Sequence, residues 1–211
     1  DFSVRRLERY LTLVYESGAA PVIVLNKSDI CDDRDSRVAE VEAIAVGVPV
    51  LAVSAVTGDG MNQLDRLVVA GKTVALIGSS GVGKSTIINY LLSEERLKTF
   101  AVGESDGRGR HTTTSRQLIQ LPSGGLVIDT PGMREIQLWG DETDLSVSFD
   151  DIETLARHCR FGDCEHQSEP GCAVLRALED GSLDKSRWES YEKLRRELRF
   201  LERKQNIRAM L

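Results

Sequence analysis

The first 130 residues combine two patterns, continuous apolar runs and segments with helical apolar spacing. Continuous runs of this length are typical of strands that are buried on both faces of a parallel sheet. Four such strands are predicted: residues 21–25, 48–53, 73–77 and 126–128. Apolar residues three and four positions apart predict helices instead. Four helices are expected: residues 3–17, 35–46, 61–69 and 87–92.

This alternation predicts an α/β fold with a mostly parallel sheet that helices cover on both faces. In such sheets, ligands bind beyond the carboxyl ends of the strands. Four residues that follow predicted strands should therefore meet at one edge: Asn26, Ser54, Gly78 and Asp129. Residues 98–115 are polar and contain several glycines, so we expect a loop there, and the alternating segment 117–121 predicts an edge strand.

The pattern changes after about residue 140, where an acidic, turn-like segment is followed by clustered Cys and His residues and a long charged helix from about residue 183. We therefore expect two domains. Residues 1–140 would form the α/β domain, and residues 141–211 a small, mainly helical one.

Composition excludes several classes of protein. The 211 residues hold 27 Lys and Arg against 33 Asp and Glu, and this net charge of −6 argues against coating nucleic acid by bulk charge. Aromatic residues make up 5%, too few for a base-stacking platform. No apolar run approaches the roughly 20 residues of a membrane helix, and the sequence does not open with a secretory signal. Three of the four cysteines lie close together beside a histidine, which indicates a metal in a reducing compartment, and we expect a cytoplasmic protein.

A phosphate-binding loop follows the predicted strand 73–77. Its sequence matches G-x-x-x-x-G-K-[ST] over Gly78, Ser79, Ser80, Gly81, Val82, Gly83, Lys84 and Ser85. The glycines let successive N–H groups point at phosphate oxygens, and the following helix adds its positive N-terminal end. We expect Lys84 to neutralise the β- and γ-phosphates, Ser85 to ligate Mg²⁺ and Thr86 to contact the nucleotide.

A second loop, Asn26-Lys27-Ser28-Asp29, follows the strand 21–25 and resembles the N-K-x-D element with which Ras-like GTPases recognise guanine. The resemblance implies that the Asp29 carboxylate accepts hydrogen bonds from guanine N1–H and its amino group, a donor pair that adenine lacks. Asn26 would support the loop, and the stem of Lys27 would cover the ring.

Two further elements resemble parts of the same family. Ser54-Ala55 resembles the S-A element whose amide faces guanine O6, and Asp129-Thr130-Pro131-Gly132 resembles D-x-x-G, which implies that Asp129 reaches Mg²⁺ through water and Gly132 senses the γ-phosphate. Thr112, Thr113 and Thr114 offer a switch threonine for Mg²⁺, and we favour Thr113. In Ras-like proteins the phosphate loop comes first, whereas here N-K-x-D and S-A do. The domain is therefore predicted to be circularly permuted, which chain termini that lie close together permit.

A metal site is predicted in the C-terminal domain. Its ligands have the spacing C-x₄-C-x-H-x₅-C: Cys159, Cys164, His166 and Cys172. Three thiolates and one imidazole suit a closed, tetrahedral, structural zinc ion. His158 is a competing ligand, and we prefer His166 because adjacent His158 and Cys159 cannot easily reach one ion. Buried cysteines without a metal are the alternative.

The permuted order, the segments 109–114 and 129–135 and the Cys/His site together resemble the RsgA/YjeQ family of small-subunit biogenesis GTPases. The resemblance implies GTP hydrolysis with Mg²⁺ that the 30S subunit stimulates, late in the maturation of that subunit. It also implies 16S rRNA as a partner, and we expect a monomer. The family also has an N-terminal OB-fold domain, absent here, and a central sheet strand just before the helix 3–17. We therefore expect chain ahead of Asp1.

The resemblance also bears on catalysis. Ras-like enzymes place a Gln directly after D-x-x-G, and Met133 at that position cannot orient water. RsgA-like GTPases share such an apolar replacement, with a switch histidine as the suspected substitute, which is His111 here. We take His111, Lys84 and Thr113 as the candidate catalytic residues. The alternative for His111 is simple packing or solvation in the loop.

The last helix carries a separate signal, because residues 185–211 have a net charge of +5 and the rest of the chain −11. Its apolar stripe predicts packing on the zinc module, with a charged outer face in water. A functional interpretation adds rRNA contacts by Arg195, Arg196, Arg199 and Arg203. Three other functions remain open: a P-loop ATPase or small-molecule kinase, a zinc-containing RNA adaptor that binds GTP structurally, and another permuted ribosome-associated GTPase.

Overall fold

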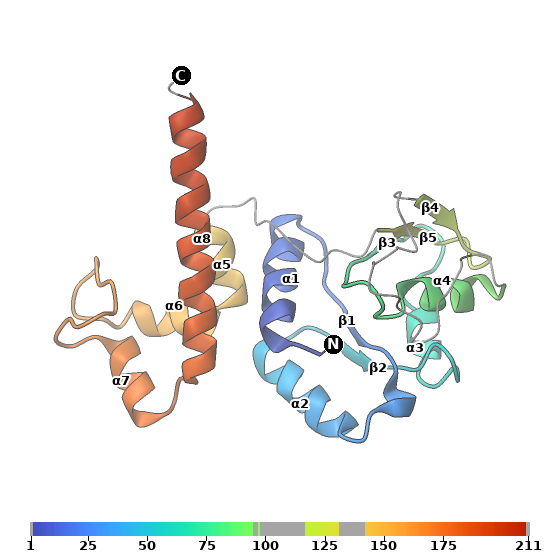
Figure 1. The fold of residues 1–211 in the computed structure, drawn as a ribbon, viewed down its shortest axis with the longest axis horizontal. Coiled ribbons are helices and arrows are strands. Elements are labelled where there is room, and N and C mark those ends of the chain that lie inside the picture. The colour runs from blue at the N-terminus through green and yellow to red at the C-terminus, as the bar shows by residue number, and fades with distance from the viewer. Residues whose placement is uncertain (1, 95–96, 98–116, 131–141, 210–211) are drawn as a thin grey trace, which may run out of the picture. The chain divides into compact units, whose positions relative to one another are not determined.

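The computed structural model describes residues 2–94, 97, 117–130 and 142–209, and these form two compact units (Figure 1). The nucleotide unit comprises Val22–Ile136 with the first two residues. The C-terminal unit comprises Gln137–Leu211 together with Ser3–Pro21. No helix in the described ranges is long and apolar enough to cross a membrane.

The described strands of the nucleotide unit form two sheets. The first pairs β1 (Ile23–Leu25) with β2 (Val50–Ala52) in parallel, with Ile23 opposite Val50. The second has the order β3-β5-β4. In it, β3 (Thr73–Leu76) runs parallel to β5 (Leu126–Asp129), and β4 (Gln117–Gln120) runs antiparallel at the edge. The predicted strands and the predicted edge strand are therefore all present.

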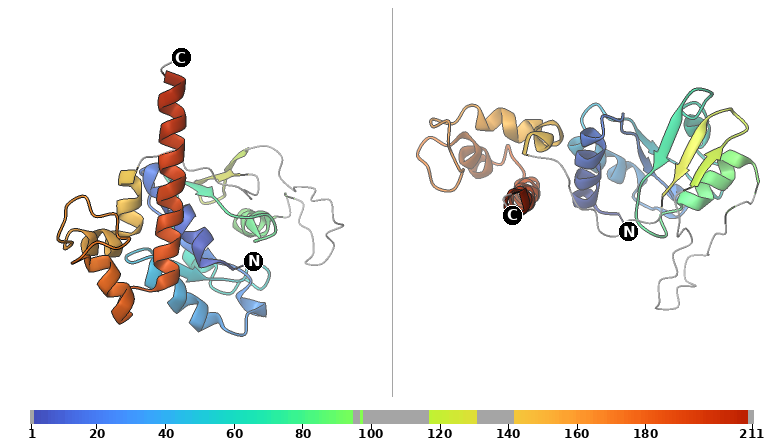
Figure 2. Two further views of the ribbon diagram at one scale, coloured as in Figure 1. Left: turned by 60° about the vertical axis from the view of Figure 1, so that its left-hand side comes forward. Right: turned by 90° about the horizontal axis from the view of Figure 1, so that it is seen from above.

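The α-helices described in this unit lie within or overlap the predicted segments, and one 3₁₀ helix was not predicted. They are the 3₁₀ helix η1 (Ser28–Ile30) and the α-helices α2 (Arg34–Ile44), α3 (Asn62–Asp65) and α4 (Lys84–Leu92). Figure 2 shows α4 lying along the β3-β5-β4 sheet, where Ile88 and Leu92 pack with Ile119 and Val127. A neighbouring cluster joins Val53, Met61 and Ile87.

Two expectations about the sheet are wrong for the described residues. The strands form two separate sheets rather than one, and β3 is not buried on both faces, because Thr73 and Ala75 are exposed. Within its sheet β3 lies at an edge and β5 at the centre, so β5 is the strand whose residues are best buried. An apolar run in the sequence cannot tell a central strand from an edge strand.

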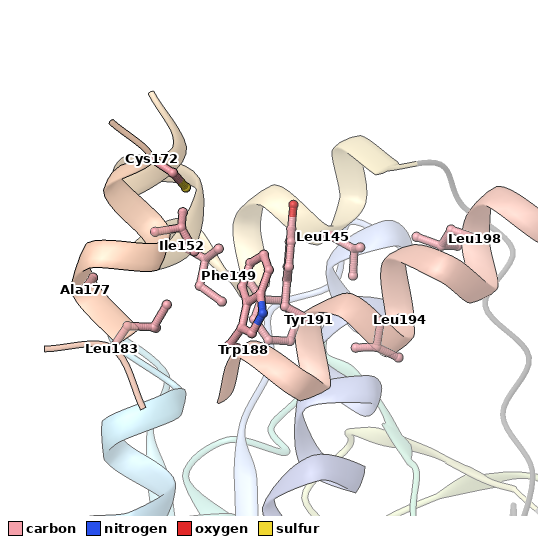
Figure 3. Close-up of a cluster of buried hydrophobic side chains, with 11 residues drawn as sticks. Leu145, Phe149, Ile152, Cys172, Ala177, Leu183, Trp188, Tyr191, Leu194 and Leu198 are labelled. Carbon is pink, nitrogen blue, oxygen red and sulfur yellow. The ribbon is translucent and has the colours of Figure 1, made fainter. Parts of the chain in front are cut away.

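The C-terminal unit is helical. It contains α1 (Val4–Glu16), α5 (Glu142–Ser148), α6 (Asp150–Ala156), α7 (Ala173–Asp180) and α8 (Lys185–Ala209). Its core is built around three aromatic rings (Figure 3). The Tyr191 ring stacks on Trp188 at 5.5 Å between centroids and meets the edge of Phe149 at the same distance.

Helix α1 packs against α5 and α8, so its contacts place it in the C-terminal unit. The sequence-based boundary at residue 140 put this helix with the α/β domain, because nothing in its apolar spacing says which partner its apolar face meets. The structure therefore divides the chain differently at its N-terminal end.

A buried polar network holds α1 in this position. Glu8 is 2% exposed and pairs with Arg187 of α8 at 2.7 Å, while the Ser190 hydroxyl donates to its other oxygen. Arg187 also donates to both carboxylate oxygens of Asp151, at 2.8 and 3.0 Å, and lies over the ring of Phe149. Burial lowers the pKa of Arg187, but its bonds to Asp151 and Glu8 outweigh this and keep the pKa above its ordinary value.

Candidate functional site

The phosphate loop connects β3 to α4, as its sequence predicts. Gly81 and Gly83 have φ of 81° and 100°, backbone conformations that side chains other than glycine adopt only with strain. The Lys84 ammonium folds back over the loop and donates to the carbonyl oxygens of Gly78 and Ser79 at 2.8 and 2.9 Å. Burial lowers the pKa of Lys84, and the nearby charge of Asp129 acts in the opposite direction.

The base-recognition loop lies directly against the phosphate loop. The amide nitrogen of Asn26 donates to the carbonyl oxygen of Val82 at 3.0 Å, and the Lys27 ammonium donates to that of Gly81 at 2.8 Å. Lys27 itself has a φ of 68°, which turns the chain into η1 and leaves Asp29 exposed. The two bonded pairs are separated by 56 and 54 positions in the sequence, so two loops that are distant along the chain form one site.

Asn26 joins a third loop to the same site. Its side-chain oxygen accepts a hydrogen bond from the Ala55 N–H at 3.1 Å. This loop is closed by bonds from Ser54 N–H to the Asp59 carbonyl and from Gly58 N–H to the Ser54 carbonyl, at 2.9 and 2.8 Å. The resemblance to S-A implied that this amide faces guanine O6. In the structure the Ala55 N–H donates to Asn26, and its role toward guanine stays a prediction.

Asp129 ends β5 beside the start of the phosphate loop. It is fully buried and pairs in register with Leu76, the last residue of β3. Ser85 lies in the first turn of α4, so this edge of the sheet carries a carboxylate and a hydroxyl near the phosphate loop. Oxygen ligands of these two kinds suit Mg²⁺, which also keeps waters and binds substrate phosphates. The residues present therefore fit a magnesium ion bound with a nucleotide.

The remaining predicted nucleotide residues lie outside the described part of the chain. They are His111, Thr112, Thr113, Thr114, Gly132 and Met133. Their roles stay predictions. Thr130, which is described, bonds through its hydroxyl to the Leu76 carbonyl oxygen at 2.6 Å.

The four predicted metal ligands of the C-terminal unit come together. Their ligand atoms all lie within 4.8 Å of one another. The Cys159 and Cys172 sulfurs are 3.8 Å apart, and the His166 Nδ1 atom lies 3.6 and 3.4 Å from them. Ordinary Zn–S and Zn–N lengths in a tetrahedral site give edges of about 3.8 and 3.5 Å. The cluster therefore fits one zinc ion.

Backbone N–H groups support the thiols of this cluster. The Cys159 sulfur accepts from Ala173 N–H at 3.3 Å, and the Cys172 sulfur caps α7 by accepting from Leu175 N–H at 3.4 Å. Burial raises the pKa of Cys159, but the N–H groups outweigh it and leave this pKa below its ordinary value. Burial and the two neighbouring thiols raise the pKa of Cys164 to about 11. A divalent cation bound here would favour the deprotonated form of all three thiols, whatever their pKa values are without it.

His166, rather than His158, belongs to the cluster. His158 is exposed, and its Nδ1 atom lies 2.7 Å from the Thr154 carbonyl oxygen. The His166 ring meets the edge of Trp188 at 5.7 Å. Burial, followed by the charge of Arg195, lowers the pKa of His166, which favours the neutral imidazole that binds metals.

Comparison with known proteins decides the family. The model of the RsgA GTPase family matches residues 1–139, which is more than half of the chain. The chain belongs to the RsgA GTPase family. Small ribosomal subunit biogenesis GTPase RsgA 1 of Oceanobacillus iheyensis is 52% identical over 99% of this chain and 60% of its own length. RsgA of Syntrophotalea carbinolica is 53% identical over 94% of this chain and 55% of its own length. The chain thus spans 55–60% of the length of these curated relatives.

Solved structures of similar proteins support the RsgA fold. YjeQ from Thermotoga maritima matches with a TM-score of 0.67 and 34% identity, over 94% of this chain and 66% of that protein. YloQ, described as a circularly permuted GTPase, matches with a TM-score of 0.63 and 28% identity, over 94% of this chain and 64% of that protein. The circularly permuted GTPase fold predicted from the motif order is therefore confirmed.

Two residues make contacts that the sequence did not indicate. In the sequence, Thr130 is a variable position of the D-x-x-G pattern, and no role was predicted for its hydroxyl. Glu169 accepts backbone N–H bonds from Glu165, Gln167 and Ser168 at 2.8–2.9 Å, and these bonds lower its pKa to about 2. The only sequence signal for Glu169 was an acidic residue inside the Cys/His loop.

Proposed function

We propose that this chain is the nucleotide-hydrolysing and zinc-bearing part of a GTPase that acts in late maturation of the 30S ribosomal subunit. GTP would bind across the contact between the base-recognition loop and the phosphate loop. The observation that carries this proposal is the double hydrogen bonding of Asn26 to Val82 and Ala55, which joins the loops for base and phosphate. The names of the relatives supply the ribosomal context.

The roles of the residues follow from their chemistry. Asp29, exposed at the loop, accepts from the N1–H and amino group of guanine. The N–H groups of residues 78–83 and the Lys84 ammonium bind the β- and γ-phosphates, where they stabilise charge that develops in the transition state. The chemistry that Mg²⁺ would supply here is positive charge to neutralise the phosphate oxygens. Ser85 and Asp129 would hold it, with Thr113 as a further candidate.

Water attack is assigned to residues outside the described ranges. Met133 offers no polar group to orient water, so His111 is the proposed substitute, placed by the ribosome when the 30S subunit binds. Replacing His111 with Ala should then abolish stimulation by 30S subunits and leave GTP affinity unchanged.

The other partners follow the same proposal. A single zinc ion on Cys159, Cys164, His166 and Cys172 would stabilise the fold of the C-terminal unit and take no part in the chemistry, since a site with four protein ligands keeps no open position. Arg195, Arg196, Arg199 and Arg203 on α8 are the candidate contacts to 16S rRNA. The protein would act as a monomer in the cytoplasm.

Hydrolysis of GTP by the full chain, with and without purified 30S subunits, tests the proposal. We expect slow turnover that 30S subunits accelerate, with GTP but not ATP competing for binding. Asp29→Asn should remove this preference for guanine, whereas Asp32→Asn, at an exposed position beyond η1, should not. Binding of GTP without single-turnover hydrolysis, even with ribosomes, would favour the zinc-containing RNA adaptor instead.

A further inference from the structure

The Thr130 hydroxyl makes a short hydrogen bond at the base of the nucleotide site. It donates to the carbonyl oxygen of Leu76 at 2.6 Å, which is near the short end of the range for O–H···O bonds. The side chain is half-buried. Leu76 ends β3 two residues before Gly78, and Thr130 directly follows Asp129 at the end of β5.

This bond lies where two strands separate. The parallel pairing of β3 and β5 runs from Thr73 opposite Leu126 to Leu76 opposite Asp129 and ends there. Beyond this pair, β3 continues into the phosphate loop. The Thr130 hydroxyl adds a side-chain bond at the point where the backbone ladder stops. It therefore ties the residue that follows Asp129 to the strand that carries the phosphate loop.

Two charged residues lie near this junction. Asp129 is fully buried, and its charge acts on Lys84, whose ammonium bonds to the phosphate-loop carbonyls. Mg²⁺ requires nearly octahedral geometry, so a carboxylate that orients one of its waters must keep a fixed position. The backbone that carries the buried Asp129 must therefore be held in place. Threonine suits the task, since its branched Cβ restricts the direction in which the hydroxyl points.

We propose that Thr130 is a positioning residue for Mg²⁺, because its hydroxyl, bonded to Leu76, fixes the Asp129 carboxylate relative to the phosphate loop. The inference rests on the proposed binding of GTP and Mg²⁺. It separates two parts of nucleotide binding. Recognition of the base and contacts from the phosphate loop do not involve Thr130, whereas the additional retention of nucleotide that Mg²⁺ confers does.

The test measures release of a fluorescent GDP analogue from the full chain at graded Mg²⁺ concentrations and in EDTA. In Thr130→Val, which keeps the branched shape and removes the hydroxyl, the Mg²⁺ concentration for half-maximal retention should rise about fivefold, the usual effect of one hydrogen bond. Thr130→Ser, which keeps the hydroxyl, should stay within about twofold of the unaltered chain. Release in EDTA should be the same for all three.

Two further variants make the result decisive. Thr73→Val makes the same change at an exposed position of β3, distant from the site in the strand, and should leave the Mg²⁺ dependence unaltered. Thr130→Ala removes the hydroxyl without any bulk, in case valine disturbs the packing. An unchanged Mg²⁺ dependence in Thr130→Val and Thr130→Ala would overturn the inference, as would loss of folding in both, because the hydroxyl would then serve the fold alone. If the unaltered chain held no guanine nucleotide, the proposed function itself would be wrong.

Discussion

Asn26 uses both ends of its side-chain amide, and this fixes the orientation of the group. The nitrogen donates to the Val82 carbonyl oxygen and the oxygen accepts from the Ala55 N–H, so a flipped amide would set donor against donor and acceptor against acceptor. A single side chain thereby holds the phosphate loop and the S-A loop at fixed positions. No aspartate or leucine of similar size could satisfy both partners.

Gly83 is required because Asn26 comes so close to it. A Cβ atom at Gly83 would lie 2.1 Å from the Asn26 amide nitrogen, whereas one at Gly81 would meet nothing within 4 Å. Both glycines have positive φ, so alanine at either position costs about 1 kcal/mol in backbone strain. Only alanine at Gly83 adds a clash, which costs a further 1–3 kcal/mol, roughly as overpacking does elsewhere.

We therefore expect Gly83→Ala to weaken GTP binding at least about fivefold more than Gly81→Ala does, because it displaces the base-recognition loop as well. Titration with a fluorescent GTP analogue measures the difference. Equal losses in the two variants would mean that the approach of Asn26 to Gly83 does not matter for binding.

At the scale of elements, a buried ion pair joins helices α1 and α8. Arg187 and Glu8 have side chains only 11% and 3% exposed. Removing one member of such a pair leaves an uncompensated buried charge, which typically costs about 3–5 kcal/mol. The exposed pair between Arg5 and Glu189 joins the same two helices, but such pairs contribute at most about 1 kcal/mol.

Glu8→Gln should accordingly destabilise the C-terminal unit by about 3 kcal/mol, and Glu189→Gln by less than about 1 kcal/mol. Urea unfolding followed by tryptophan fluorescence reports on this unit, since Trp188 lies in its core. Similar midpoints for the two variants would show that the buried network does not hold α1.

Glu169 organises the loop that carries the zinc ligands, because one carboxylate accepts three backbone N–H groups around His166. Glu169→Ala should leave these donors without their acceptor and speed the loss of zinc to a chelator about tenfold, comparable with the loss of a supporting residue in other metal sites. Glu179→Ala, at an exposed position of α7, is the matched control. Equal rates of zinc release would contradict this role.

The sequence predicted the elements well and their partners less well. Apolar periodicity located the strands and α-helices described in the nucleotide unit, because burial of one face sets the spacing of apolar residues, but it did not indicate the 3₁₀ helix η1. The Cys/His cluster could be predicted because its chemistry is visible in the residue types. The burial of Glu8 could not, since it depends on Arg187 more than 170 residues away. The separation into two sheets and the exposure of β3 likewise depend on pairing, which spacing does not encode.

Over the whole molecule, the two units are interleaved along the chain. The C-terminal unit contains α1 as well as α5 to α8, and the nucleotide unit lies between α1 and α5 in the sequence. Residues 142–211 alone should therefore be less stable than the same fragment mixed with a peptide of residues 2–18, because α1 supplies the partner of Arg187. Unfolding of the fragment with and without the peptide measures this, and a peptide carrying Glu8→Gln should stabilise it less. No effect of the unaltered peptide would mean that α1 is dispensable there.

The membership of α1 in the C-terminal unit has a consequence for how the two units are connected. Within this chain the nucleotide unit is an insert, attached to one body at both of its ends. The first attachment leads within a few residues into β1 and Asn26, and the second follows Asp129 and Thr130. Both connections to the helical body therefore lie close in the sequence to the proposed nucleotide site, one beside the loop for the base and the other shortly after the carboxylate proposed for the metal.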